Sequence, residues 1–339
     1  MKTCPEGHGE TALSRKEKVK MEKRYDVVAL GELLIDFTEN GTSAQGNPLM
    51  EANPGGAPCN VLAMLKKLGK NCAFIGKVGD DLFGRMLRDE IVRAGIIDDA
   101  LLTDHEARTT LAFVKTFPNG DRDFSFYRNP GADMLLREDE LPLEMLRDTR
   151  IFHFGTLSMT HPAVRRATKT AVRTAKDAGA IISFDPNLRP PLWANLNEAK
   201  EQIAWGLSQC DILKIADNEL KFMTGEEDFA RGAAVLREQF PNIRILNITA
   251  GGDGSWSWCG EYHAFEAACT RGGVIETTGA GDTFCACVLN DVLEYGLENR
   301  TEADLHRMLR FANMAAWIVT TRKGAIRSMP ERKEIIVLL

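Results

Sequence analysis

From Tyr25 onward, short apolar runs of strand length alternate with amphipathic stretches of helix length. The candidate strands are Asp26–Leu30, Cys72–Val78, Ile151–Phe154, Ala180–Phe184, Asp211–Ile215 and Ile243–Thr249, followed by a hairpin of Ser255–Trp258 with Tyr262–Glu266. The candidate helices are Cys59–Leu68, Leu82–Ala94, Pro162–Ala178, Asn197–Ser208, Phe229–Gln239, Asp282–Tyr295 and Glu302–Thr321. Strands and helices that alternate in this way form a parallel sheet covered on both faces. The sequence therefore predicts an α/β fold, with a doubly wound, mostly parallel sheet flanked by helices.

Two regions depart from this alternation and predict a second, smaller sheet. Thr109–Phe117 and Asp121–Arg128 are rich in β-forming residues, and Asn119-Gly120 between them suits a tight hairpin turn. Residues 36–53 are polar and turn-rich, without a helical period. Together these regions indicate a small β lid over one end of the main sheet. Ligands of open α/β sheets bind beyond the carboxyl ends of the strands, so the site is expected there.

The 339 residues suffice for one large domain with an insertion. We expect a single α/β domain over residues 25–339, with lid strands inserted around 37–54 and 109–128. Residues 1–24 form an expected N-terminal extension without regular structure. This extension has no apolar segment of the signal-peptide kind, and no apolar run in the chain approaches the roughly 20 residues that a membrane span requires.

Cysteine usage and net charge bear on location and partners. Eight cysteines are scattered along the chain and form no CxxC pair, which indicates reduced thiols in a cytoplasmic protein. The net charge of −6 argues against a nucleic-acid partner, because phosphate backbones need a basic surface. It does not exclude a small anionic ligand, which backbone amides can bind on an acidic protein.

The segment that carries most chemical information is 276–284, Glu-Thr-Thr-Gly-Ala-Gly-Asp-Thr-Phe, which precedes an apolar, helix-compatible run. Small residues at Gly279, Ala280 and Gly281 let the backbone approach a ligand, and at a helix start their N–H groups and the helix dipole form an anion site. Asp282 would repel that anion, unless its role is to accept a proton from a hydroxyl that attacks phosphorus. An Asp at a helix start is also a common N-cap, so the segment alone leaves both interpretations open.

The same segment resembles the C-terminal signature of the ribokinase (PfkB) family of carbohydrate kinases, D-T-x-G-A-G-D. Residues 53–60, Asn-Pro-Gly-Gly-Ala-Pro-Cys-Asn, resemble the family's sugar-site signature, and residues 76–84 match its G-x-V-G-x-D-x-x-G motif. The resemblance spans roughly Tyr25 to Pro330, with the motifs in family order. The chain has neither a Walker A motif nor a GxGxxG motif after a strand, which disfavours P-loop kinases and Rossmann dehydrogenases.

The resemblance implies an ATP-dependent sugar kinase with Asp282 as the catalytic base. The backbone of Gly279, Ala280 and Gly281 would hold the transferring γ-phosphoryl group, and such a sparse site suffices because phosphoryl transfer needs mainly positioning and charge stabilisation.

The resemblance also implies a sugar pocket. Asp36, at the end of the expected first strand, would accept hydrogen bonds from two hydroxyls, and Gly55, Gly56 and Asn60 would complete the pocket. Arg128 resembles an arginine that the fructose-specific members place over the sugar; a solvated arginine at the end of a hairpin is the alternative.

For the nucleotide, the resemblance implies a set of loop residues near the ends of later strands. Asn187 and Arg189, in Asp-Pro-Asn-Leu-Arg, would face the phosphates. Thr249, Gly251 and Gly254 match the family's nucleotide loop, and Asn313 on the last long helix would flank the adenine.

Two departures from the family pattern concern metal ions. The family often has N-x-x-E near magnesium, whereas this chain keeps Glu219 but has Ala216 in place of the asparagine, so Mg²⁺ would be bound by Glu219 through water. Glu276 replaces the aspartate that belongs to a potassium site in many relatives, with Gly324 and Ser328 matching its later loop. The resemblance therefore leaves open whether K⁺ binds.

The sequence thus predicts phosphorylation of D-fructose to D-fructose 6-phosphate. Alternatives are a kinase of another sugar or sugar acid (2-keto-3-deoxygluconate, ribose, tagatose or a nucleoside) and a non-catalytic regulatory member. Relatives commonly pair through their β lids, so the resemblance also suggests a homodimer.

Overall fold

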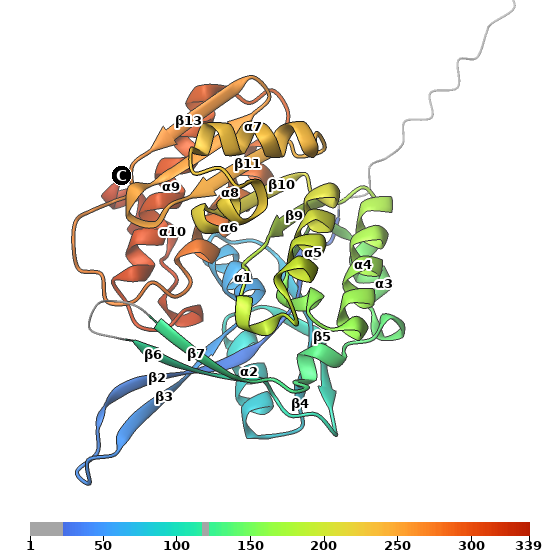
Figure 1. The fold of residues 1–339 in the computed structure, drawn as a ribbon, viewed down its shortest axis with the longest axis vertical. Coiled ribbons are helices and arrows are strands. Elements are labelled where there is room, and N and C mark those ends of the chain that lie inside the picture. The colour runs from blue at the N-terminus through green and yellow to red at the C-terminus, as the bar shows by residue number, and fades with distance from the viewer. Residues whose placement is uncertain (1–22, 117–121) are drawn as a thin grey trace, which may run out of the picture.

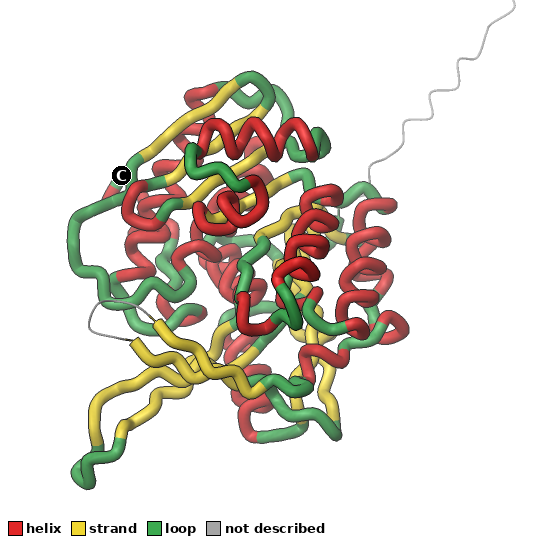
Figure 2. Tube along the Cα trace, in the orientation of Figure 1, coloured by secondary structure: helices red, strands yellow, loops and turns green. Residues whose placement is uncertain are grey.

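The computed structural model describes residues 23–116 and 122–339. Within these residues the main sheet has nine strands in the order β13-β12-β11-β10-β9-β8-β1-β4-β5, and helices cover both of its sides (Figures 1 and 2). The strands are β1 (Tyr25–Leu30), β4 (Cys72–Gly79), β5 (Ile97–Asp104), β8 (Thr149–Gly155), β9 (Ile181–Asp185), β10 (Ile212–Ala216), β11 (Ile245–Thr249), β12 (Ser255–Cys259) and β13 (Tyr262–Glu266). Neighbours from β11 to β5 run parallel, and β12 and β13 add antiparallel pairs. The predicted doubly wound, mostly parallel sheet is confirmed.

Helices cover both faces because the central strands are apolar on both sides. In β1, Val27 and Ala29 belong to one core, whereas Val28 and Leu30 belong to the other. The first core includes residues of α1 (Ala57–Lys67), α2 (Leu82–Arg93), α8 (Ala280–Tyr295), α9 (Glu302–Thr320) and α10 (Arg332–Leu338). The second includes residues of α3 (Leu143–Arg147), α4 (Pro162–Asp177), α5 (Leu196–Gln209), α6 (Asp217–Thr224) and α7 (Phe229–Gln239).

The predicted helices and strands are present, with ends that differ by a few residues. Sequence analysis missed β5, an edge strand that contains acidic residues and is only partly buried. It also missed α3, α6 and α10, which are too short to show a clear helical period.

A second sheet, in the order β3-β2-β6-β7, forms the predicted lid (Figure 1). Its strands are β2 (Leu34–Thr42), β3 (Pro48–Gly55), β6 (Leu111–Thr116) and β7 (Arg122–Tyr127). Most of the polar, turn-rich stretch from residue 36 to 53 is strand, because β2 pairs with β3 on one side and β6 on the other. The expected turn at Asn119-Gly120 and nearly all of the expected N-terminal extension lie outside the described residues.

The first strand ends at Leu30, as its predicted range had it, so Asp36 lies beyond its end. β1 stops at Leu30, the chain turns through residues 31–33, and β2 begins at Leu34 in the lid. The turn packs tightly, since a Cβ on Gly31 would lie 2.6 Å from Pro58 Cγ. Asp36 is therefore a residue of a lid strand, and the expectation that it ends the first strand of the main sheet was wrong.

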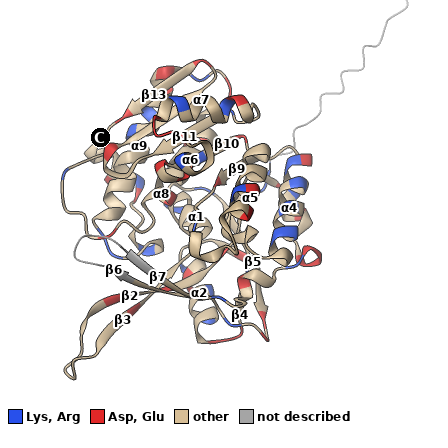
Figure 3. Ribbon diagram, viewed as in Figure 1, with Lys and Arg blue, Asp and Glu red and all other residues tan. Residues whose placement is uncertain are grey.

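Charges and thiols complete the description of the described residues. Basic and acidic residues occur side by side on helices such as α4 and α5 (Figure 3). All seven cysteines in residues 23–116 and 122–339 are free, and five of them are buried. In these same ranges, no helix combines the length and the apolar character needed to cross a bilayer.

Candidate active site

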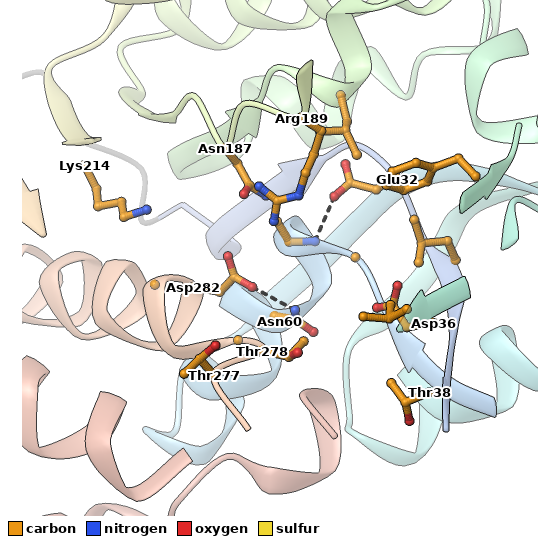
Figure 4. A pocket seen from close by; sticks show the side chains of 18 residues that line it. Glu32, Asp36, Thr38, Asn60, Asn187, Arg189, Lys214, Thr277, Thr278 and Asp282 are labelled. Atoms are coloured by element: carbon orange, nitrogen blue, oxygen red, sulfur yellow. Dashed lines mark hydrogen bonds between the residues drawn. The ribbon is translucent and has the colours of Figure 1, made fainter. Parts of the chain in front are cut away.

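A cavity of about 260 Å³ lies between the lid and the carboxyl ends of the central strands. In Figure 4, Glu32, Asp36 and Thr38 lie on one side of it, and Lys214 and Asp282 lie on the other. The lining includes eight of the residues predicted for the site: Asp36, Gly56, Asn60, Asn187, Arg189, Gly279, Gly281 and Asp282. The fold thus joins side chains from the lid, α1, the loop after β9 and the start of α8.

Helix α8 begins at this cavity. Its N-cap, Gly279, has φ +80°, a left-handed conformation that glycine adopts without strain. The first N–H groups of a helix have no partner inside the helix and favour an anion there. Gly279 and Gly281 line the cavity, whereas Ala280 does not, and the Ala280 N–H donates to Thr277 O at 3.3 Å. Two of the three predicted backbone positions are therefore at the cavity, as an anion site there would require, and the third, Ala280, is not.

Asp282 is the acidic residue in the first turn of this helix. Asn60 Nδ2 donates to its Oδ2 at 2.8 Å. Burial raises the pKa of Asp282 to about 6, and the Asn60 hydrogen bond opposes that rise. At neutral pH the group is therefore mainly ionised and able to accept a proton.

The lid side of the cavity contains two carboxyl groups. Asp36 lies beside Gly55, where an added Cβ would be 2.7 Å from Asp36 Oδ2, so glycine leaves room for the carboxylate. Glu32 is 3% exposed, and its Oε1 accepts the N–H of Ala57 at 2.8 Å. Burial raises the pKa of Glu32 to about 7. Asn60 adds a polar atom to this wall, because its Oδ1 is buried without a hydrogen-bond partner among the described residues.

Arg128 does not line the cavity. Its guanidinium donates to Asp133 Oδ2 at 2.6 Å and to Leu157 O at 3.0 Å through Nη2, and to Thr160 Oγ1 at 2.8 Å through Nη1. The side chain is 2% exposed, so the solvated alternative was wrong. Instead of lying over the cavity, Arg128 ties the end of β7 to the segment after β8, and its charge favours ionisation of nearby Glu32.

The loop after β9 carries Asn187 and Arg189 into the cavity. Asn187 has φ +45°, which is uncommon for a residue other than glycine. Glu219, buried at the start of α6, accepts the N–H of Leu188 at 2.7 Å and the N–H of Ala216 at 2.9 Å. Both Glu219 oxygens thus hold backbone in place, and this residue does not line the cavity. Among residues 23–116 and 122–339, no group of three or more His, Cys, Asp or Glu side chains could hold a metal ion.

Lys214 lines the cavity from β10. Its ammonium lies 3.1 Å from Oδ2 and 3.2 Å from Oδ1 of Asp185, at the end of the neighbouring strand. Burial alone would lower the pKa of Lys214, but the carboxylates of Asp185, Glu219 and Asp282 outweigh burial and raise it. Lys214 is therefore a permanent positive charge beside Asp282.

The other residues predicted to bind nucleotide lie outside this cavity. Thr249 ends β11 in register with Ala216 of β10, so it is at the same edge of the sheet. An added Cβ on Gly254 would lie 2.3 Å from Glu266 O, so this glycine is needed for packing. The Asn313 amide accepts from Ser255 Oγ at 2.8 Å and donates to Glu266 O at 3.0 Å. Gly251 has φ +50°, and a Cβ added to it would meet nothing within 4 Å.

Glu276 joins two loops behind α8. Its Oε1 accepts from Thr278 Oγ1 at 2.5 Å, and its Oε2 accepts the N–H of Gly324 at 3.1 Å. Ser328 Oγ in turn donates to Gly324 O at 2.9 Å. The three residues expected near a monovalent cation are thus brought together by direct hydrogen bonds.

Sequence reasoning missed Glu32 and Lys214. Each had a signal, because Glu32 interrupts an apolar run and Lys214 lies within the run Ile212-Leu-Lys-Ile. Charged residues are rarely buried in a parallel strand without a partner or a function.

Comparisons with known proteins give the family of the chain. Residues 24–332 match the model of the pfkB family carbohydrate kinases. The chain is 41% identical to the probable fructokinase-2 of Arabidopsis thaliana, over 92% of this chain and 95% of that protein. The fructokinase of Xylella fastidiosa with bound ATP superposes with a TM-score of 0.81 at 30% identity, over 92% of this chain and 97% of that one.

A second structure, the fructokinase of Vibrio cholerae with fructose, ADP and calcium, superposes with a TM-score of 0.82 at 26% identity, over 93% of this chain and 99% of that one. Together with the family match over nearly the whole length, this likeness leads to one conclusion. The chain belongs to the pfkB family of carbohydrate kinases.

Proposed function

We propose that this protein transfers the γ-phosphoryl group of ATP to D-fructose, with ADP and D-fructose 6-phosphate as products. One observation carries the proposal: a single cavity holds the start of α8, the ionisable Asp282 and the hydroxyl-binding groups Asp36 and Asn60. Transfer of phosphate to a sugar needs three groups around one space: an anion site, a base, and acceptors for the sugar hydroxyls.

In the proposed reaction, Asp282 accepts the proton of the C6 hydroxyl while that oxygen bonds to the γ-phosphorus. The bond between this phosphorus and the β–γ bridging oxygen breaks, and ADP leaves with the electron pair. Gly279 and Gly281 bring the helix start close to the phosphoryl group, where its N–H groups and dipole favour the negative charge. Asn60 holds Asp282 in place through the 2.8 Å hydrogen bond.

ATP is proposed to extend from the cavity along the carboxyl edge of the sheet. Asn187 and Arg189 would face its phosphates, and the loop with Thr249 and Gly251 continues the same edge toward the adenosine. A bound Mg²⁺ would neutralise phosphate charge. Glu219 does not line the cavity and both of its oxygens accept backbone N–H groups, so any contact between Glu219 and Mg²⁺ would run through water, which fits an ion that keeps much of its hydration.

Fructose is the proposed sugar because the relatives that match nearly the full chain are named fructokinases. The lining has carboxyl groups at Glu32 and Asp36 and apolar side chains at Leu34, Val114 and Leu157. This combination suits a neutral polyol better than a sugar acid, since a sugar carboxylate would meet two carboxyl groups.

The test is a coupled ADP-release assay with Mg-ATP against fructose, ribose, tagatose, 2-keto-3-deoxygluconate and adenosine. We expect selective turnover of fructose. Asp282→Asn should lower kcat by about 10³-fold, because the general base is lost, while the Kd for Mg-ATP changes little. In the wild type, kcat/KM should fall about tenfold per pH unit below pH 6, since protonated Asp282 cannot accept the proton.

Turnover of another panel member would keep the chemistry and replace the sugar. ATP binding without turnover of any panel sugar would contradict the proposal and favour a regulatory role. Full activity of Asp282→Asn would exclude this residue as the base.

We also propose a cytoplasmic homodimer that pairs through the lids. Leu49 and Met50 on the lid are 48% and 39% exposed, and Tyr127 is 66% exposed. In sedimentation experiments the wild type should behave as a dimer, and the variants Leu49→Glu and Met50→Glu should each behave as monomers. If the variants sediment as the wild type does, this contact is excluded. Cell fractionation tests the location.

A further inference from the structure

Strands β8, β9 and β10 carry a polar stripe through an otherwise apolar core. His153 Nδ1 lies 3.0 Å from Ser183 Oγ on the next strand, and Asp185 pairs with Lys214 on the strand after that. All four side chains are buried. Strands buried on both faces are normally apolar throughout, because an unpaired polar group is costly there. The charged pair, Asp185 and Lys214, lies at the end of the stripe that is near the start of α8. We therefore ask what this buried charge does at the site.

The charged end of this stripe reaches the cavity. Lys214 Nζ lies 3.1 Å from the position that a Cβ on Gly281 would occupy, so the ammonium is next to the helix start. The Lys214 side chain is 8% exposed, and that exposure faces the cavity. Among the described lining residues, the permanent cations are Lys214 and Arg189, against the carboxyl groups of Glu32, Asp36 and Asp282.

The hydrogen-bonding capacity of Lys214 is not exhausted by its partner. An ammonium has three N–H donors. The contacts of 3.1 and 3.2 Å to the two Asp185 oxygens use at most two of them. At least one donor is left for a ligand atom in the cavity.

We propose that Lys214 is a catalytic residue whose ammonium donates a hydrogen bond to the transferring phosphoryl group and neutralises charge there, while Asp185 fixes its position. This inference rests on the proposed phosphoryl transfer. The helix start supplies only partial positive charge, whereas a desolvated ammonium supplies a full one close to the reacting atoms. Phosphoryl transfer depends largely on such positioned charge.

A purely structural role would be that Lys214 only neutralises buried Asp185. The two roles separate in a double variant. Lys214→Met keeps the side-chain length but leaves Asp185 unpaired, whereas Lys214→Met with Asp185→Asn removes both charges. If charge balance were the whole role of Lys214, the double variant would recover activity.

Lys77→Met is a matched control, because Lys77 is also a buried lysine in an ion pair, with Glu140 at 2.8 Å, but it does not line the cavity. Each variant is compared by thermal melting, kcat, and KM for fructose and ATP. We expect kcat to fall by about 10²-fold or more in both Lys214 variants, as for other transition-state donors, with KM for fructose within about threefold. Lys77→Met should lower the melting temperature and leave kcat near the wild-type value.

The outcomes are distinct. Recovery of kcat to within about threefold of the wild type in the double variant would overturn the inference, as would an unaffected Lys214→Met. If Lys214→Met alone does not fold, the kcat of the charge-neutral double variant, Lys214→Met with Asp185→Asn, tests the inference. A wild type that turns over no sugar would overturn the proposed function itself, whereas an active wild type with active Lys214 variants overturns only the role of Lys214.

Discussion

At the scale of one residue, the buried carboxyl group of Glu32 makes the free energy of unfolding depend on pH. Its carboxyl group is buried between the main sheet and the lid, and burial raises its pKa from 4.5 to about 7. The folded protein therefore holds a proton on Glu32 between about pH 4.5 and 7 that the unfolded chain releases. By linkage, the free energy of unfolding must fall as the pH rises through this range.

Glu32→Gln should remove this loss. Glutamine keeps an oxygen to accept the Ala57 N–H but carries no titrating group. The free energy of unfolding of Glu32→Gln relative to the wild type should increase by about 3 kcal/mol from pH 4.5 to 7, from the difference in pKa. Urea unfolding at a series of pH values measures this. Glu238→Gln, at an exposed position on α7, is the control and should show no comparable trend; an equal trend in both variants would contradict the assignment.

At the scale of an element, α8 depends on small residues at its start. A Cβ on Gly281 would lie 3.1 Å from Lys214 Nζ, so Gly281→Ala should displace the ammonium or the helix start by a few tenths of an ångström or more. We expect kcat to drop by up to about 10²-fold, since misplacement on this scale is costly to phosphoryl transfer. Alanine favours helix more than glycine does, so the melting temperature should not fall.

Gly252→Ala is the matched control for this variant, because a Cβ there meets nothing within 4 Å. It should keep the wild-type kcat, and because Gly252 lies within the loop proposed to bind the nucleotide, any effect of this variant should appear in KM for ATP. A fully active Gly281→Ala would show that the space beside Lys214 is not needed.

The two loops joined by Glu276 lead to a prediction about salt. The Glu276 carboxylate accepts hydrogen bonds from Thr278 and Gly324, so it links the loops without a cation. We expect kcat in sodium and potassium buffers of equal ionic strength to agree within about twofold, because a charge already engaged by two donors gains little from an added ion. Strong activation by K⁺ would show that a cation binds there in addition. Glu276→Asp, with its shorter side chain, is the variant in which any dependence on K⁺ should be largest.

For the whole molecule, the described fold is anchored from Lys23 onward. Lys23 Nζ donates to Ala178 O at 3.1 Å, and the Arg24 N–H donates to Asp148 Oδ1 at 3.0 Å. A chain that starts at Met21 should therefore keep full activity and a melting temperature within about 2 °C of the full length. A chain that starts at Asp26 loses these contacts and the first residue of β1, and should melt lower. A large loss in the Met21 chain would show that the preceding residues contribute to the fold.

The sequence by itself determined the α/β class, most strands and helices, the family, and the eight predicted residues that line the cavity. It could do so because strand and helix periodicity and short motifs are local properties of the chain. The glycines before Asp282 likewise indicate a helix start from local sequence alone.

Only the tertiary structure decided which distant groups meet. Asn60 and Asp282 are 222 positions apart and share a hydrogen bond, and Arg128 turns inward to Asp133 and Leu157 instead of lining the cavity. The strand pairing that makes β2 part of the lid, and with it the position of Asp36, is likewise a long-range contact. Burial, pKa and the direction of a long side chain depend on such neighbours, and no local pattern records them. For that reason the sequence could mark Glu32 and Lys214 as unusual, but only the folded chain placed them at the cavity.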